Sequence, residues 1–223
     1  MARQAGSPTE PRTPLSRERI LRAAIELADE HGIESLTMRK LGQALGVEAM
    51  SLYNHVANKD DLLNGITELI ISEVELPSAD EEWDAALRKI AISAHDALSR
   101  HAWACNLMLS PAAINPARIH YMDSLLAVFR ESGFSADVTY SAYHALDAHI
   151  FGFSLWQATH AMTAAQVPDL ESRALHNLPL EDAPYVTEHI KQHMIEGPHR
   201  GVSAFELTLD QIIAGLKRLR ADA

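Results

Sequence analysis

The sequence has little of the chemistry that marks common enzyme families. It contains one cysteine and has no HExxH or CxxC motif of the kind that indicates a zinc site. It also has no glycine-rich loop of the kind that holds phosphates. Neither Cys105 nor Ser154 has the flanking pattern of a turn that exposes a nucleophile. An enzyme is therefore the least favoured class of function, and we expect no cofactor.

The single cysteine and the short apolar runs bear on location. Cys105 has no partner for an internal disulfide, which fits a reducing cytoplasm, and a small buried apolar role is expected for it. The longest apolar run, Ile150 to Trp156, is interrupted by Gly152 and Ser154, whereas a membrane helix needs roughly 18 apolar residues. The polar, proline-bearing N-terminus does not resemble a secretory signal. We expect a cytoplasmic protein with no membrane partner.

Histidine is abundant, with twelve residues, yet no diagnostic metal spacing is present. His144 and Asp147 share a helix face at i, i+3, and His189 and His193 share one at i, i+4. Neither pair has a third ligand at a spacing typical of a metal site. We therefore expect no bound metal.

The net charge of −11 is unusual for a nucleic-acid-binding protein, but it is unevenly distributed. Residues 1–60 contain eight Lys and Arg against eight Asp and Glu, so the whole acidic excess lies beyond residue 60. Salt screens charges separated by more than about 8 Å, so a distant acidic region does not prevent local phosphate contacts. It should, however, suppress nonspecific DNA binding.

A segment from Leu36 to Lys59 contains the clearest local pattern. Its first half predicts a short helix, because Thr37 can cap the N-terminus and four residues form one stripe at i, i+3, i+4 and i+7. These four are Met38, Leu41, Gly42 and Leu45. Gly46 suits the left-handed conformation that ends many helices, and Leu52 and Val56 then mark a second helix. Two short helices joined by a glycine turn predict a helix-turn-helix.

The exposed face predicted for the second helix has two interpretations. It contains Ala49, Met50, Tyr53 and Asn54, instead of the Glu and Lys usual on a solvated face. Small, aromatic and amide groups suit base edges and phosphates in the DNA major groove. The alternative is a helical hairpin within a larger bundle, with Tyr53 and His55 as half-buried packing residues.

The segment resembles the DNA-binding domain of the TetR family of transcriptional regulators. The similar residues run from Arg17 to about Ile66 and include RERILRAAIELADEHGIESLTMRKLGQALGVEAMSLYNHVANKDDLL. GVEAMSLYNHVANK is especially similar to the tetracycline repressors. The resemblance implies a homodimer whose two recognition helices bind a pseudo-palindromic double-stranded DNA operator, and a small-molecule effector, apolar or aromatic, that releases it. A ligand-responsive regulator, most simply a repressor, is therefore expected.

Site residues follow from this resemblance and from the helix faces. The residues expected to contact bases or phosphates are Thr37, Arg39, Ala49, Met50, Ser51, Tyr53, Asn54, His55 and Lys59. In the family the lysine that matches Lys59 contacts a phosphate. Tetracycline repressors have a tryptophan where this chain has Asn54, which can pair bidentately with adenine, so a different operator is expected.

The remaining helical pattern predicts an all-α protein in three parts. Residues 1–15 form a flexible arm, residues 16–75 a three-helix DNA-binding domain with a linker helix, and residues 76–223 an effector-binding and dimerisation domain. Helices are expected over residues 16–31, 58–74, 83–100, 103–109, 116–132, 135–162, 184–195 and 203–220, with a loop at 168–184. The helix over 16–31 should bury Ile20, Ala24, Leu27, Ala28 and His31.

Two of these helices suit dimerisation. The last helix has a wide apolar stripe that contains Phe205, Leu209, Ile212, Ile213, Leu216 and Leu219. The longest helix carries the small residues Ala145, Ala148 and Gly152, which allow another helix to approach closely. Two such helices from each of two chains would form a four-helix bundle. The alternative is that these stripes pack only within one chain.

The C-terminal domain has candidates for an apolar effector cavity. They are Trp103, Met108, Phe129, Tyr143, Phe151 and Trp156, with His95, His144 and Asp147 as polar groups. Trp156 stands where tetracycline repressors hold an acidic residue, so a metal-chelated drug is not the expected ligand. A filled core without a cavity is the alternative, and it would fit a ligand-independent DNA-binding or adaptor protein.

Overall fold

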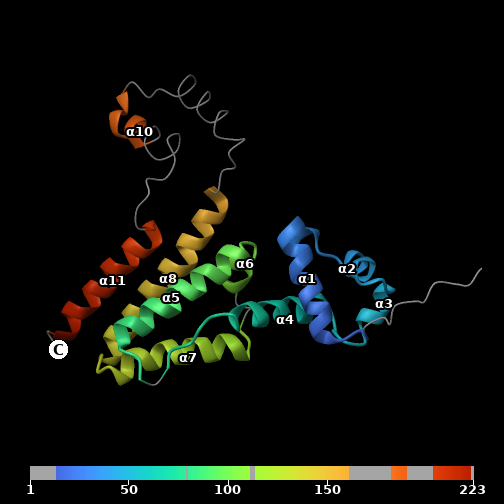
Figure 1. Cartoon of the computed structure of the whole chain (residues 1–223), viewed down its shortest axis with the longest axis horizontal. Coiled ribbons are helices and arrows are strands. Elements are labelled where there is room, and N and C mark those ends of the chain that lie inside the picture. The colour runs from blue at the N-terminus through green and yellow to red at the C-terminus, as the bar shows by residue number, and fades with distance from the viewer. Residues whose placement is uncertain (1–13, 79, 111–113, 161–181, 190–202, 222–223) are drawn as a thin grey trace, which may run out of the picture.

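The computed structural model describes residues 14–78, 80–110, 114–160, 182–189 and 203–221, and it is all-helical over them (Figure 1). The 3-10 turn η1 covers Ile33–Ser35. The α-helices are α1 Arg17–His31, α2 Met38–Leu45, α3 Ala49–Leu52, α4 Lys59–Ile71, α5 Trp83–Arg100, α6 Ala104–Met108, α7 Pro116–Glu131, α8 Ala136–His160, α10 Pro184–His189 and α11 Ala204–Ala221. None of the helices in these ranges is both long and apolar enough to cross a membrane.

Helices α1 to α3 and the first half of α4 form a small body with its own core. Side-chain caps define where its helices begin: Ser16, Thr37 and Asn58 each accept a hydrogen bond from the backbone N–H three residues later. The shared core contains Ile20, Leu21, Ala24, Leu36, Leu41, Leu52, Val56, Leu62 and Ile66, all buried. The Thr37 cap and most of this core agree with the sequence prediction, and Ser16 and Asn58 lie where the predicted helices begin.

The turn between α2 and α3 depends on two glycines. Gly46 adopts the left-handed conformation, with φ 68° and ψ 33°. Gly42 lies where the two helices are closest, because a Cβ atom there would sit 2.9 Å from the carbonyl oxygen of Val47 and 3.2 Å from the amide nitrogen of Ala49. Both neighbours are backbone atoms, so any larger residue would push α3 away from α2.

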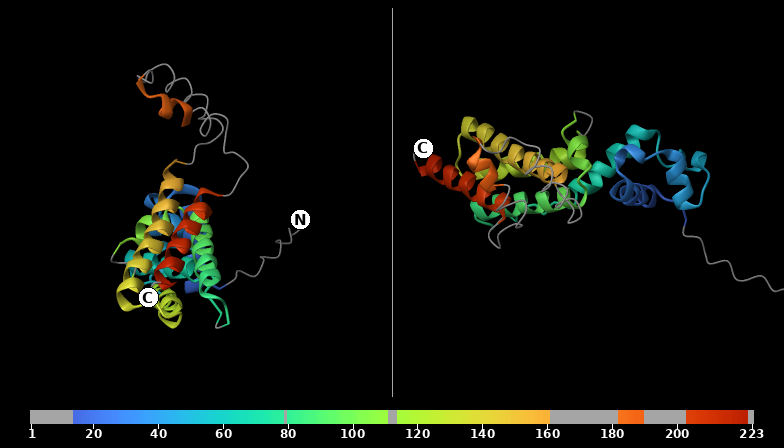
Figure 2. Two further views of the ribbon diagram at one scale, coloured as in Figure 1. Left: turned by 90° about the vertical axis from the view of Figure 1, so that its left-hand side faces the viewer. Right: turned by 90° about the horizontal axis from the view of Figure 1, so that it is seen from above.

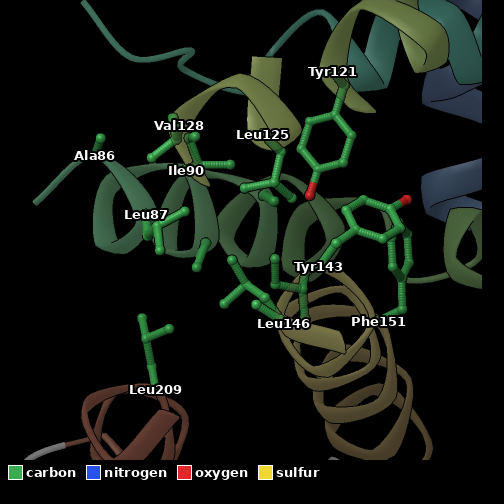
Figure 3. Packing of buried hydrophobic residues seen from close by; sticks show 14 of the residues in the cluster. Ala86, Leu87, Ile90, Tyr121, Leu125, Val128, Tyr143, Leu146, Phe151 and Leu209 are labelled. Atoms are coloured by element: carbon green, nitrogen blue, oxygen red, sulfur yellow. The ribbon is translucent and has the colours of Figure 1, made fainter. Parts of the chain in front are cut away.

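Helices α5, α7, α8 and α11 enclose the second and larger core (Figure 3). The buried face of α5 runs from Trp83 through Leu87 and Ile90 to Leu98. At one end, Phe134 packs edge-on against Trp83 and Phe129, with ring centroids 5.1 and 5.7 Å apart. Close aromatic packing of this kind fills that end of the bundle.

Helix α4 joins the two bodies (Figure 2). Its Leu62 and Ile66 belong to the first core, and its Ile70 and Ile71 belong to the second. Thr67, between these pairs, accepts a 3.2 Å hydrogen bond from the side-chain amide of Asn115 at the start of α7. A shift of α4 relative to the second core therefore moves the first body as well.

Several details differ from the sequence prediction. His31 is exposed at the end of α1, where its ring lies 3.6 Å from Glu30, and Leu21 is buried instead. The packing of α1 against its neighbours buries a face that includes Leu21 and excludes His31. The spacing of apolar residues alone does not distinguish these two faces. Leu219, expected on the apolar stripe of α11, is 52% exposed. The predicted arm before residue 14, the loop over 168–181 and the end of the helix beyond residue 189 lie outside the described residues.

Candidate nucleic-acid interface and ligand cavity

The short helix α3 presents an exposed surface that is unusual in composition. Leu52 is fully buried beneath it, and this anchors the helix to the first core. On the outer side, Met50 is 74% exposed and Tyr53 is 43% exposed, although both side chains are large and apolar. Asn54 beside them is also exposed. Met50 lies on α3, whereas Tyr53 is its C-cap and Asn54 lies in the turn that follows, so the helix ends before the predicted Val56. The projecting methionine, tyrosine and amide form a surface suited to contact with base edges.

The other predicted DNA contacts surround this helix. Thr37, Arg39 and Lys59 are exposed, and Ala49, Ser51 and His55 are partly buried. The Thr37 hydroxyl also caps α2, so it holds the helix end while remaining at the surface. The α3 region thus gathers an aromatic ring, an amide, two cationic side chains and a hydroxyl within the segment 37–59.

An ion pair between α1 and α4 holds the chain directly after α3. The guanidinium of Arg17 donates to both carboxylate oxygens of Asp61, over 2.7 and 2.9 Å, and to the carbonyl oxygen of His55 over 3.1 Å. Asp61 also accepts a 2.8 Å bond from the backbone N–H of Ala57. These bonds, led by the one from Arg17, lower the pKa of Asp61 to about 2. Sequence periodicity did not identify this pair, which fixes the end of α3.

A second polar contact connects the two bodies. Asp29 near the end of α1 accepts a 2.7 Å hydrogen bond from the indole N–H of Trp103. The same carboxylate lies 2.9 Å from Nδ1 of His101, whose Nε2 lies 3.5 Å from Glu73. Glu73 follows α4 and also pairs with Arg100 at 2.6 Å. The turn between α5 and α6 is thereby joined to both α1 and the end of α4.

The second core contains a buried polar cluster between α7 and α8. Arg118 donates a 3.1 Å hydrogen bond to Asp147, and the hydroxyl of Tyr143 donates to the same oxygen over 3.4 Å. The guanidinium lies over the rings of Tyr121 and Phe151, at 5.2 and 4.8 Å from their centroids. Cation–π contacts of this kind stabilise a cation that has been removed from water.

Two oxygens of this cluster are buried and unpaired. Within the described part of the chain, the Tyr121 hydroxyl and Oδ1 of Asp147 have no hydrogen-bond partner. Burial raises the pKa of Asp147, although Arg118 opposes that shift. Burial also raises the pKa of Tyr121 well above its usual range, and the nearby Asp147 adds to the effect. The Tyr121 hydroxyl therefore stays protonated and remains a hydrogen-bond donor.

Arg118 and Tyr121 also line a small cavity in the second core. Its other lining residues come from four helices and the segment after α4: Ile70, Ile71, Val74, Ala94, Ala97, Leu98, Met108 and Phe151. The volume is about 20 Å³, which is about the space of one water molecule. The core is therefore close to filled, and anything larger must displace a wall. One of those walls is α4.

The predicted ligand residues divide into two groups. Met108 and Phe151 line the cavity, and Tyr143 and Asp147 belong to the adjoining polar cluster. The sequence prediction missed Arg118 and Tyr121. The signal for them was a charged residue on the inward stripe of α7, because Arg118, Tyr121 and Leu125 follow one another at i, i+3 and i+7.

The remaining predicted ligand residues lie away from the cavity. Trp156 is 55% exposed and stacks on His160, and His144 is exposed against the ring of Tyr140. Both therefore face outward from α8, which corrects their assignment to the cavity. Phe129 is buried in the aromatic packing at the other end of the core, and Trp103 is bonded to Asp29.

His95 has a structural environment of its own. Its Nδ1 lies 2.8 Å from the hydroxyl of Ser154 on α8, and its ring stacks on Phe205 of α11 with centroids 4.0 Å apart. Burial lowers the pKa of His95, which favours the neutral ring. This contact joins α5 to α8 and α11. Among the described residues, no three His, Cys, Asp or Glu side chains are grouped to hold a metal ion.

Two family models together match most of the chain. Residues 20–66 match the model of bacterial regulatory proteins of the tetR family, and residues 76–220 match the tetracyclin repressor-like C-terminal domain. The class D tetracycline repressor of Escherichia coli is 32% identical over 216 residues, covering 91% of this chain and 96% of that protein. The repressor DrrR1 of Streptomyces coeruleorubidus is 30% identical over 148 residues, covering 64% of this chain and 53% of that protein.

Solved structures agree with this. A variant of TetR from Acinetobacter baumannii AYE in complex with minocycline is 26% identical, with a TM-score of 0.66 over 92% of this chain and 95% of its own. Apo ActR from Streptomyces coelicolor, at 24% identity, shares the fold with a TM-score of 0.71 over 94% of this chain and 98% of its own. The helix-turn-helix geometry, the two family matches and the full-length similarity agree: the chain belongs to the TetR family of transcriptional regulators.

Proposed function

We propose that this chain, a ligand-responsive transcriptional repressor of the TetR family, binds a pseudo-palindromic DNA operator as a homodimer in the cytoplasm and releases it when a small apolar effector enters the second core. Residues 16–75 read DNA, and residues 76–223 bind the effector and dimerise, with residues 1–15 as an arm. Family membership implies a role other than catalysis.

The observation that carries the proposal is the exposed surface formed by α3 and the turn that follows it. Tyr53, Asn54 and Met50 contact base edges in the major groove, with Ala49 and Ser51 at the rim of the same surface. The backbone contacts come from residues on either side of α3 in the chain. Thr37, His55 and Lys59 hold the phosphates on the two sides of the groove, and Arg39, in the first turn of α2, contacts either a base edge or a phosphate.

Dimerisation uses the outer faces of α8 and α11. The two helices border a groove lined largely by small and apolar side chains. They include Val138, Ser141, Ala142, Ala145, Ile212, Gly215, Leu216 and Leu219. Small residues let two helices of the partner approach closely, and a two-fold axis there would place two copies of α3 on one face of a duplex.

Effector binding acts through α4. A molecule larger than water enlarges the cavity by moving a wall, and Ile70 and Ile71 form the wall that continues into the DNA-binding body. The contact of Asp29 with Trp103 gives a second connection to α1. The effector releases DNA only to the extent that it binds the moved form more tightly than the operator-bound form.

Selection of bound sequences from random duplex DNA tests this proposal. We expect an enriched palindrome whose half-sites are about 34–36 Å apart, one turn of DNA. Footprinting should show two protected half-sites, and light scattering should give one homodimer for each duplex. Enrichment of a single undivided site by a monomer would contradict the dimer, and no enrichment would contradict DNA reading itself.

A further inference from the structure

The unpaired groups beside the cavity indicate what kind of molecule it accepts. We propose, building on the function proposed above, that the effector is a neutral, largely apolar molecule that presents a carbonyl-type oxygen to the Tyr121 hydroxyl and the Arg118 guanidinium. Both side chains line the cavity, and both are hydrogen-bond donors. The other lining side chains are apolar, so they contribute burial of a hydrocarbon surface without further polar contacts.

The Tyr121 hydroxyl has no evident structural role in the resting core. Tyr121 is only 3% exposed, and its oxygen has no hydrogen-bond partner among the described residues. A buried hydroxyl without a partner destabilises a fold, and phenylalanine would fill the same space without that cost. A ligand oxygen at this position would give the hydroxyl the partner that it lacks.

The charges of the cluster select against acids. Arg118 is already neutralised by Asp147, and both side chains are largely buried. A ligand carboxylate would therefore bring a net negative charge into the core, near the unpaired Oδ1 of Asp147. Burying a net charge is costly, whereas a neutral carbonyl keeps the cluster balanced and still accepts a hydrogen bond. The expected ligand is thus a ketone, quinone, ester or amide, and not a carboxylic acid.

Three probes of similar size and different polarity test this assignment on the full-length protein. They are 2-acetylnaphthalene, 2-isopropylnaphthalene and 2-naphthoate, which carry a neutral carbonyl, no polar group and a carboxylate. Dissociation constants are measured by calorimetry, with the thermal midpoint as a second readout. We expect 2-acetylnaphthalene to bind and 2-naphthoate to bind at least tenfold more weakly.

Two variants separate ligand binding from folding. Tyr121→Phe should fold with unchanged or higher stability. It should weaken the binding of 2-acetylnaphthalene about tenfold relative to the binding of 2-isopropylnaphthalene. Asp147→Asn keeps the shape of the side chain but leaves the cluster with a net positive charge, so it should gain affinity for 2-naphthoate. A merely structural role for either residue predicts parallel changes for all three probes.

The possible outcomes are distinct. An unchanged affinity ratio in Tyr121→Phe, preferred binding of 2-naphthoate by the wild type, or no binding of any probe would overturn the assignment. Operator binding, measured on the same wild-type sample, distinguishes a failure of the effector chemistry from a failure of the proposed function. A protein that binds its operator but fails the probe test contradicts only the effector chemistry, and a protein that binds no duplex contradicts the function on which it rests.

Discussion

The indole N–H of Trp103 donates a 2.7 Å hydrogen bond to Asp29, and this bond links the second body to α1 of the first. His101 adds a second contact to the same carboxylate. A carboxylate held by two donors from one turn fixes the position of that turn more firmly than a single bond would. The orientation of α1 therefore follows the turn between α5 and α6.

Loss of this link should weaken operator binding without unfolding the protein. Asp29→Asn keeps the shape of the side chain but removes its charge, so we expect the free energy of unfolding to fall by about 1 kcal/mol and operator affinity to fall by about three- to tenfold. Fluorescence anisotropy with a labelled operator measures the affinity. Asp123→Asn, at an exposed position on α7, is the matched control and should change neither quantity. Equal operator affinity of the two variants would show that the contact between Asp29 and Trp103 does not contribute to operator binding.

The ion pair of Asp61 with Arg17 should make stability depend on pH. Because the folded-state pKa of Asp61 is lowered to about 2 from 3.8, the pair stabilises the protein above pH 3.8, and this contribution disappears as the pH falls through about 2. Partial exposure limits it to about 1 kcal/mol. Urea unfolding of Asp61→Asn should therefore differ from wild type at pH 6 and converge with it toward pH 2. The neighbouring Asp60→Asn should show no such convergence.

Gly42→Ala should displace the recognition helix. The new Cβ would lie 2.9 Å from a backbone oxygen, so α3 must move by several tenths of an ångström or more. We expect a loss of about 1–3 kcal/mol in stability and at least a tenfold loss in operator affinity. Circular dichroism and light scattering should show that helix content and the dimer persist. Wild-type operator affinity in this variant would mean that the position of α3 is not critical.

Ala145→Glu should separate the subunits. Ala145 is exposed on α8 and lines the groove beside α11, so a glutamate there would bury a charge in the proposed dimer interface. We expect a folded monomer in light scattering and at least a hundredfold loss of operator affinity. Ala85→Glu, also at an exposed helical alanine, should remain dimeric. An intact dimer in Ala145→Glu would place the interface elsewhere.

Local signals allowed much of this fold to be predicted. Ser16, Thr37 and Asn58 begin helices because a short polar side chain caps free N–H groups, and Gly46 ends one because it tolerates positive φ. These effects act within a few residues, so the sequence reveals them directly. The family resemblance then added expectations that periodicity cannot give, namely the partner and the mechanism.

Contacts between distant residues could not be predicted in the same way. Asp29 meets Trp103 across 74 positions, and Arg118 meets Asp147 across 29. No local period encodes such pairs, because they depend on how helices pack. For the same reason the sequence pattern predicts that Trp156 lines the cavity although it faces outward, because an aromatic residue on a long helix has the same pattern whether or not another helix covers it.

The most direct test of the central claim is the affinity of the dimer for its selected operator compared with a scrambled duplex, measured by anisotropy at about 150 mM salt. We predict a preference of at least about a thousandfold. Tyr53→Ala should reduce this preference by at least tenfold. Arg39→Ala should weaken binding to the operator by at least tenfold, and both variants should leave the dimer intact. Equal affinity of the wild-type protein for the operator and the scrambled duplex would contradict the account.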